Sequence, residues 1–112
     1  MRFGSSAMVA LVVATSVACD AQSTGAPSNT PSVGVNDNYF SPTSVTIAVG
    51  DTVRWVWGGQ VAHNVTFDAV NGAPANCGNL GAGVCTRVFT VAGTFLYTCT
   101  LHAGMDGSVT VH

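Results

Sequence analysis

Residues 93–105 read GTFLYTCTLHAGM, and this stretch carries the strongest fold signal in the chain. Phe95, Tyr97 and Cys99 share one face of an extended strand, because successive side chains of a strand point to opposite faces. Similar stretches, rich in Val, Thr and aromatic residues and separated by Gly and Asn turns, predict a single all-β sandwich domain. They are residues 45–49, 53–57, 63–67 and 109–111.

The segment after Cys99 must leave the strand. In a continued strand Cys99 and His102 would point to opposite faces, so the two side chains could not reach one metal ion. Ala103, Gly104 and Gly107 are small residues that suit a tight loop. The sequence therefore predicts a turn that brings His102 back toward Cys99.

Four side chains form a candidate metal site: His63, Cys99, His102 and Met105. A thiolate, two imidazoles and a weak axial thioether are the ligands of blue-copper electron-transfer centres. Structural zinc sites use Cys and His and rarely a thioether. Asn64, next to His63, is predicted to hydrogen-bond across to the Cys99 loop and to fix ligand orientation.

The chain resembles the plastocyanin group of cupredoxins. The resemblance rests on four segments, followed by His102 and Met105: NYFSP at 38–42, VGDTV at 49–53, HNVTF at 63–67 and GTFLYTC at 93–99. It implies a Greek-key β-sandwich that binds one type 1 copper ion near one end. The two residues between His102 and Met105 give a short loop, similar to that of amicyanins. The resemblance also implies that His102 is partly exposed and serves as the electron port.

The sequence departs from the plant plastocyanin pattern in two ways that affect which partner protein is expected. Thr98 stands where plant plastocyanins have Tyr before the ligand Cys, and the chain has no acidic cluster. A charged partner docking at the side is therefore not expected. We expect redox proteins to dock at a low-charge, apolar patch around His102 that includes Leu101, Ala103 and Met105.

The N-terminal segment is predicted to direct export. Residues 1–18 hold one Arg and a short apolar run, which is typical of a secretory signal and too short for a convincing membrane span. A buried N-terminal helix is the alternative. Small residues before Cys19 favour lipid attachment at this Cys, whereas ordinary cleavage nearby would leave a soluble protein. Residues 19–32 are predicted to be a flexible tether and residues 33–112 the folded domain, on the periplasmic side of the cell envelope.

Cys77 and Cys85 flank a Gly-rich segment, predicted to be a loop. An exported protein can keep a disulfide, and we expect these two residues to form one. A second metal site is the alternative, but no His or acidic residue lies between them. With Cys19 modified and this pair bonded, Cys99 is left as the free thiol.

The amino-acid composition and the length of the chain disfavour some classes of function. Three Lys or Arg and five Asp or Glu give a net charge of −2 with His neutral, so no basic patch for nucleic acid exists. The membrane is expected as a partner only through the lipid at Cys19, and the chain is expected to be a monomer. Electron transfer is the preferred function, with copper delivery or storage as the alternative. An enzyme with Cys99 and His102 as a nucleophile pair is disfavoured, because about 80 residues leave no room for a substrate cleft.

Overall fold

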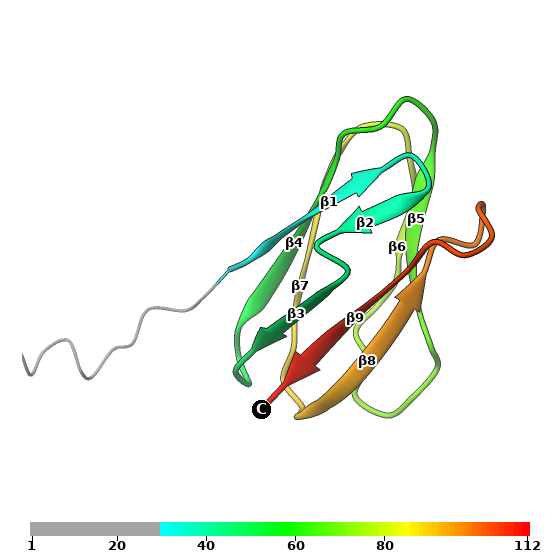
Figure 1. Ribbon diagram of the computed structural model, residues 1–112. Helices are drawn as coiled ribbons and strands as arrows, with labels where there is room; N and C mark the ends of the chain where they lie inside the picture. The colour runs from blue at the N-terminus through cyan, green and yellow to red at the C-terminus, as the bar shows by residue number, and fades with distance from the viewer. Residues whose placement is uncertain (1–29) are drawn as a thin grey trace, which may run out of the picture.

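The computed structural model describes residues 30–112, which form a β-sandwich (Figure 1). The predicted signal segment, Cys19 and most of the tether lie outside the described residues. The first strand begins at Ser32, one residue before the predicted start of the domain. The strands are β1 Ser32–Asn36, β2 Tyr39–Ser41, β3 Ser44–Ile47, β4 Thr52–Trp57, β5 His63–Phe67, β6 Cys77–Leu80, β7 Gly83–Val88, β8 Gly93–Thr98 and β9 Asp106–Val111.

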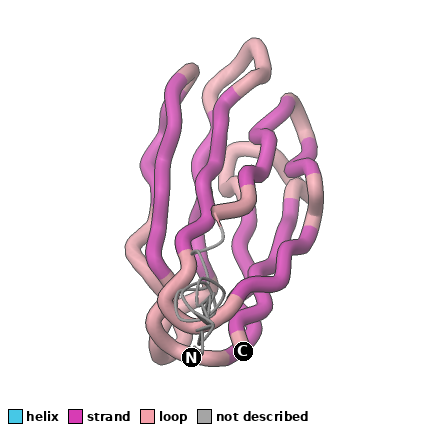
Figure 2. Tube along the Cα trace, turned by 90° about the vertical axis from the view of Figure 1, so that its left-hand side faces the viewer, coloured by secondary structure: helices cyan, strands magenta, loops and turns pink. Residues whose placement is uncertain are grey.

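Two sheets make the two layers seen edge-on in Figure 2. One sheet has the strand order β2-β1-β4-β7 and the other β3-β9-β8-β5-β6. β1 runs parallel to β4 and β3 parallel to β9, while the other pairs are antiparallel. The all-β, Greek-key fold class predicted from the sequence is therefore confirmed. No helix within residues 30–112 is long and apolar enough to cross a membrane.

The core consists of the inward side chains that alternate along the strands. In β4, Val53 and Trp55 are fully buried, whereas Arg54 between them is exposed. The Trp55 ring meets Tyr97 of β8 edge to face, with ring centroids 5.4 Å apart, and meets Phe67 of β5 at 5.8 Å. Such aromatic pairs contribute roughly 0.5–1.5 kcal/mol beyond the area they bury. The centre of the sandwich is thus a rigid aromatic cluster that joins both sheets.

The strand predicted over residues 45–49 extends two residues too far, and Val49 at its end is half exposed. β3 ends at Ile47, and the chain then turns: the Asp51 amide donates to the Ala48 carbonyl, and Asp51 Oδ2 accepts from the Ala48 amide. Gly50 in this turn has φ 96°, a conformation that favours glycine. Val49 belongs to the turn and not to the strand.

The segment between Cys77 and Cys85 was expected to be a loop, and this too is wrong. Residues 77–80 form β6 at the edge of the five-stranded sheet, and residues 83–88 form β7 at the edge of the other sheet. Only the bend at 81–82 between them is irregular. The segment is therefore the crossover that carries the chain from one layer to the other.

The loops that matter for function gather at one end of the sandwich. Figure 1 shows the β1–β2 turn, the β4–β5 connection and the β8–β9 loop at the end opposite the C-terminus. The pairing explains this, since β1 and β4 run side by side in the same direction and end together. The candidate ligands lie on two of these three connections or beside them.

Candidate metal centre

Three candidate ligands converge at the loop end of the sandwich. His63 begins β5, Cys99 follows β8, and His102 lies in the β8–β9 loop. Cys99 Sγ is 3.8 Å from His63 Nδ1 and 3.5 Å from His102 Nδ1. The three donor atoms all lie within 4.8 Å of one another. His63 and Cys99 are buried, whereas His102 is partly exposed.

The predicted turn after Cys99 is present. The His102 amide donates to the Cys99 carbonyl at 3.3 Å, and the Met105 amide donates to the His102 carbonyl at 3.4 Å. Gly104, with φ 80°, allows the chain to reverse. The loop closes where the Met105 carbonyl accepts from the Cys99 amide at 2.9 Å and from Thr98 Oγ1 at 3.0 Å. Cys99 and Met105 thus face each other across the base of the loop.

Two smaller expectations about this loop are corrected. Met105 is fully buried, so it adds nothing to an exposed patch around His102. Gly107 lies in β9 and not in the loop, directly opposite Tyr97 of β8. A Cβ at Gly107 would overlap the ring and hydroxyl of Tyr97. Gly107 is therefore needed for packing and not for the turn.

Asn64 links the two halves of the site, as predicted. Its Nδ2 donates to Thr100 Oγ1 at 2.8 Å, and its Oδ1 accepts from the Thr100 amide at 3.1 Å. The same Nδ2 donates to Asn79 Oδ1 of β6 at 2.9 Å. The Asn64 backbone amide points at Cys99 Sγ, 3.4 Å away. One side chain therefore ties β5 both to the loop that carries Cys99 and to the neighbouring edge strand.

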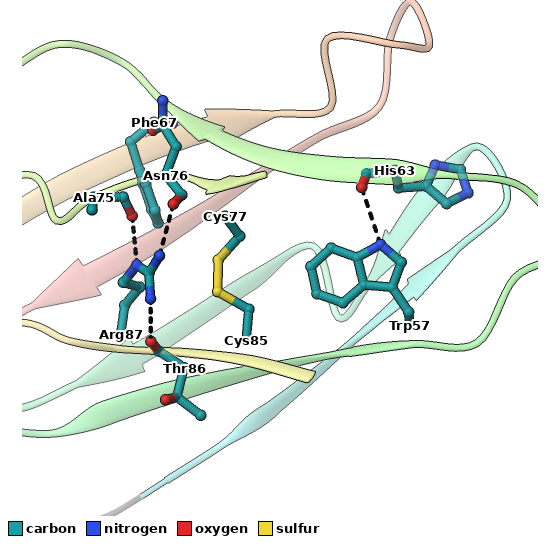
Figure 3. The surroundings of a disulfide bond; sticks show 9 residues. All are labelled: Trp57, His63, Phe67, Ala75, Asn76, Cys77, Cys85, Thr86 and Arg87. Atoms are coloured by element: carbon teal, nitrogen blue, oxygen red, sulfur yellow. Dashed lines mark hydrogen bonds between the residues drawn. A yellow bond between two sulfur atoms is a disulfide. The ribbon is translucent and has the colours of Figure 1, made fainter. Parts of the chain in front are cut away.

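Trp57 fixes the backbone of His63 itself. Its indole Nε1 donates to the His63 carbonyl at 3.1 Å, as Figure 3 shows. The bond is buried and joins the end of β4 to the start of β5. Trp57 belongs to the core, and this hydrogen bond gives it a second role, because it holds the His63 backbone in place.

Asp37 is the residue of the site that sequence reasoning missed. It lies in the β1–β2 turn, and its Oδ1 is 2.9 Å from His63 Nε2. The hydrogen bond with His63 and then that from the Gln60 amide lower the pKa of the Asp37 carboxyl below its usual value. The sequence holds no local signal for this contact. Asp37 and His63 are 26 residues apart, and only the parallel pairing of β1 with β4 brings them together.

The residues present suit copper. Two imidazole nitrogens and a thiol sulfur converge in a buried space, and Met105 provides a thioether in the same interior. This mixture of soft and intermediate donors suits copper better than a hard cation such as Mg²⁺. Asn64 and Thr100 hold the loop, so the donors are already in place for a metal. The positions of the donor atoms and their chemical types therefore both fit a copper ion.

Comparison with known proteins gives the same result. Residues 29–112 match the family model described as copper binding proteins, plastocyanin/azurin family. The chain is 39% identical to plastocyanin of Scenedesmus fuscus over 83 residues, which cover 64% of this chain and 85% of that protein. It is 34% identical to amicyanin of Paracoccus versutus over 88 residues, covering 76% of this chain and 67% of that one.

A solved structure agrees with the sequence relatives. The purple cupredoxin of Nitrosopumilus maritimus superposes with a TM-score of 0.66 and 30% identity, covering 73% of this chain and 99% of that one. This chain therefore belongs to the plastocyanin/azurin family of copper-binding proteins, the cupredoxins.

Proposed function

We propose that this chain is a type 1 copper protein that carries single electrons between redox partners, with His63, Cys99, His102 and Met105 as the metal ligands. The convergence of three donor atoms within 4.8 Å at one end of a rigid sandwich carries the proposal. Bound there, copper would supply a one-electron Cu(I)/Cu(II) couple. Met105, fully buried beside the base of the loop, is proposed as the fourth and weakest ligand that would hold the copper.

The protein frame is proposed to keep the site nearly unchanged during electron transfer. Asn64 and Trp57 fix the two segments that carry the ligands, and each makes a hydrogen bond that crosses from one element to another. Such bonds orient metal ligands. Little reorganisation of the protein would then accompany each electron, which is the requirement for a fast carrier.

His102 is proposed as the electron port. Its Nδ1 faces Cys99 Sγ, while the residue remains partly exposed, so it spans the distance from the buried site to solvent. Leu101 and Ala103 beside it are exposed and uncharged. We infer that redox proteins dock on these two residues and His102, and that the chain acts as a monomer.

Export through the N-terminal segment, with lipid attachment at Cys19, is part of the same proposal. The disulfide between Cys77 and Cys85 supports it, because structural disulfides persist mainly in oxidising compartments such as the periplasm. Mass spectrometry of the mature protein would test it. An N-terminus other than acylated Cys19 would exclude the lipid anchor.

Copper delivery is the second candidate, and it uses the same ligands. An enzymatic role is not proposed, because the family match and the plastocyanin and amicyanin relatives favour an electron carrier. Reversible voltammetry with fast exchange would support the carrier. Ready transfer of copper to an apo-acceptor, with slow electrochemistry, would support delivery instead.

The first test is the colour of the copper-loaded protein. We expect Cu(II) to give an intense blue species, because charge transfer from the Cys99 thiolate is strongly allowed, and we expect Cys99→Ser to abolish the colour. Met105→Gln should keep copper but lower the reduction potential, since a weak thioether ligand tunes that potential. A colourless protein that binds one copper per chain would overturn the assignment.

A further inference from the structure

We propose that the Asp37 carboxylate is a positioning residue for copper: it fixes the tautomer and orientation of His63, and its negative charge lowers the reduction potential of the site. This inference rests on the proposed type 1 site but concerns a residue outside the four ligands.

The contact with Asp37 determines the tautomer of His63. A carboxylate can only accept hydrogen bonds, so the His63 Nε2 that lies 2.9 Å from Asp37 Oδ1 carries the proton. In a neutral imidazole the other nitrogen then keeps its lone pair. That nitrogen, Nδ1, faces Cys99 Sγ at 3.8 Å. Asp37 therefore selects the one tautomer that offers a metal a free donor atom inside the site.

Asp37 is itself held in place by backbone amides. The Gln60 amide donates to both carboxylate oxygens at 2.9 Å, and the Val61 amide donates to Oδ1 at 3.2 Å. Gly59 leaves the room that this arrangement needs, because a Cβ there would overlap Asp37 Oδ1. The carboxylate thus joins the β1–β2 turn to the β4–β5 connection, which leads directly into His63.

The contact between Asp37 and His63 differs from an ordinary surface ion pair. The Asp37 side chain is 37% exposed, so solvent screens it, and we assign it no large part in folding stability. Its partner, however, is completely buried. The charge therefore acts through the His63 ring on the metal position. A negative charge there favours the more positive oxidation state, Cu(II), and so lowers the reduction potential.

The test compares variants that separate charge from hydrogen bonding. Asp37→Asn keeps the shape and an acceptor oxygen but removes the charge. Asp37→Ala removes both, and Gly59→Ala keeps the carboxylate but displaces it. Asp68→Asn is the matched control, because it removes the same charge from an exposed carboxylate just beyond the far end of β5.

We expect Asp37→Asn to raise the reduction potential. A tenfold loss of preference for Cu(II) over Cu(I) corresponds to about 59 mV for a one-electron couple. Asp37→Ala should in addition weaken copper binding by about 10–100-fold, which is the usual effect of removing such a partner. Gly59→Ala should shift the potential in the same direction as Asp37→Asn, and Asp68→Asn should leave it unchanged. Equal shifts in Asp37→Asn and Asp68→Asn would overturn the charge effect.

Nitrogen NMR of His63 in the copper-free protein gives a readout that does not depend on colour. We expect a proton on Nε2 in the wild type and a mixture of tautomers in Asp37→Ala and Gly59→Ala. An unchanged tautomer in both variants would overturn the positioning role. If all variants are blue and share one reduction potential, Asp37 does not influence the copper site, but the type 1 assignment stands. A colourless copper-loaded wild type would instead exclude the type 1 site itself.

Discussion

Tyr97 is a buried phenol at the centre of the aromatic core, and only 1% of it is exposed. Its hydroxyl and the Trp55 indole N–H both lack a hydrogen-bond partner of normal geometry. Burial raises the pKa of Tyr97 to about 12, and a weak interaction with Trp55 offsets part of that rise. The fold thus tolerates a polar group that it does not satisfy.

This residue gives a prediction about alkaline pH. Unfolded Tyr ionises near pH 10, so the raised pKa contributes stability that is fully present below about pH 10 and is lost as the pH rises to about 12. Two pH units correspond to roughly 2–3 kcal/mol. We expect the free energy of unfolding of Tyr97→Phe to fall less over this range than that of the wild type, in urea titrations of the copper-free protein.

At neutral pH the same variant should be as stable as the wild type or more stable, because it removes an unsatisfied buried hydroxyl. Tyr39→Phe is the control, since Tyr39 is exposed and its removal should leave the alkaline loss intact. An alkaline loss that is equal in wild type and Tyr97→Phe would contradict the prediction.

At the residue scale, the donor types predicted much of the site. Cys99 and His102 are recognisable because their side chains are rare in this chain and their spacing demands a turn. Asp37 is not recognisable, because one carboxylate among five acidic residues carries no mark of its partner. Gly107 was wrongly assigned to the turn after Cys99. Glycine is required at this position because any side chain would overlap Tyr97 on the neighbouring strand.

At the element scale, β6 and β7 are the two edges that face each other across the sandwich. Cys77 of β6 and Cys85 of β7 form a disulfide between the sheets (Figure 3). Beside it, the Arg87 guanidinium donates to the carbonyls of Ala75 and Asn76, both at 2.7 Å. The disulfide and the arginine together close one side of the sandwich.

Loss of this disulfide should destabilise the fold without removing the copper site. The bridge spans a sequence separation of 8, so restricting the unfolded chain is worth about 2–3 kcal/mol. We expect the double variant Cys77→Ala and Cys85→Ala to lose that much free energy of unfolding and to stay blue, because the copper ligands lie on other elements. Denaturant unfolding and the visible spectrum measure the two effects.

Val84→Ala is the matched control for this variant, because Val84 is an exposed neighbour of Cys85 on the same strand. A double variant as stable as this control would show that the disulfide contributes little. Loss of colour in the double variant would instead show that β6 supports the site strongly, through the hydrogen bond from Asn64 to Asn79.

The strands that the sequence predicted show apolar alternation, but β1 was missed although its Val33 and Val35 are also fully buried. β4 is one of the predicted strands, and the burial of its side chains alternates along it. β7 gave no comparable signal, because none of its residues is buried: Cys85 and Arg87 on one face are only partly buried, and its other residues are exposed. β6 buries only Cys77. Edge strands with so little apolar pattern are read from sequence as loops, which is the error made for residues 78–84.

At the scale of the whole molecule, charge is sparse. Residues 30–112 contain only four Asp and two Arg, so their net charge is −2 with His neutral. Charged residues on a docking surface steer encounters and make rates depend on ionic strength. Leu101 and Ala103, which flank His102, carry no charge. The surface proposed for docking therefore provides little electrostatic steering.

Electron self-exchange tests this directly, because the partner is a second copy of the same molecule and its charge is known. We expect the self-exchange rate, measured by NMR line broadening in mixtures of oxidised and reduced protein, to change only mildly with salt. Leu101→Asp is the matched comparison: two copies would then bring like charges together at the port, so the rate should be lower in dilute buffer and rise steeply as salt screens the repulsion. If the wild type already shows a slope as steep as that of the variant, the two molecules meet at a charged surface, and His102 is not the port.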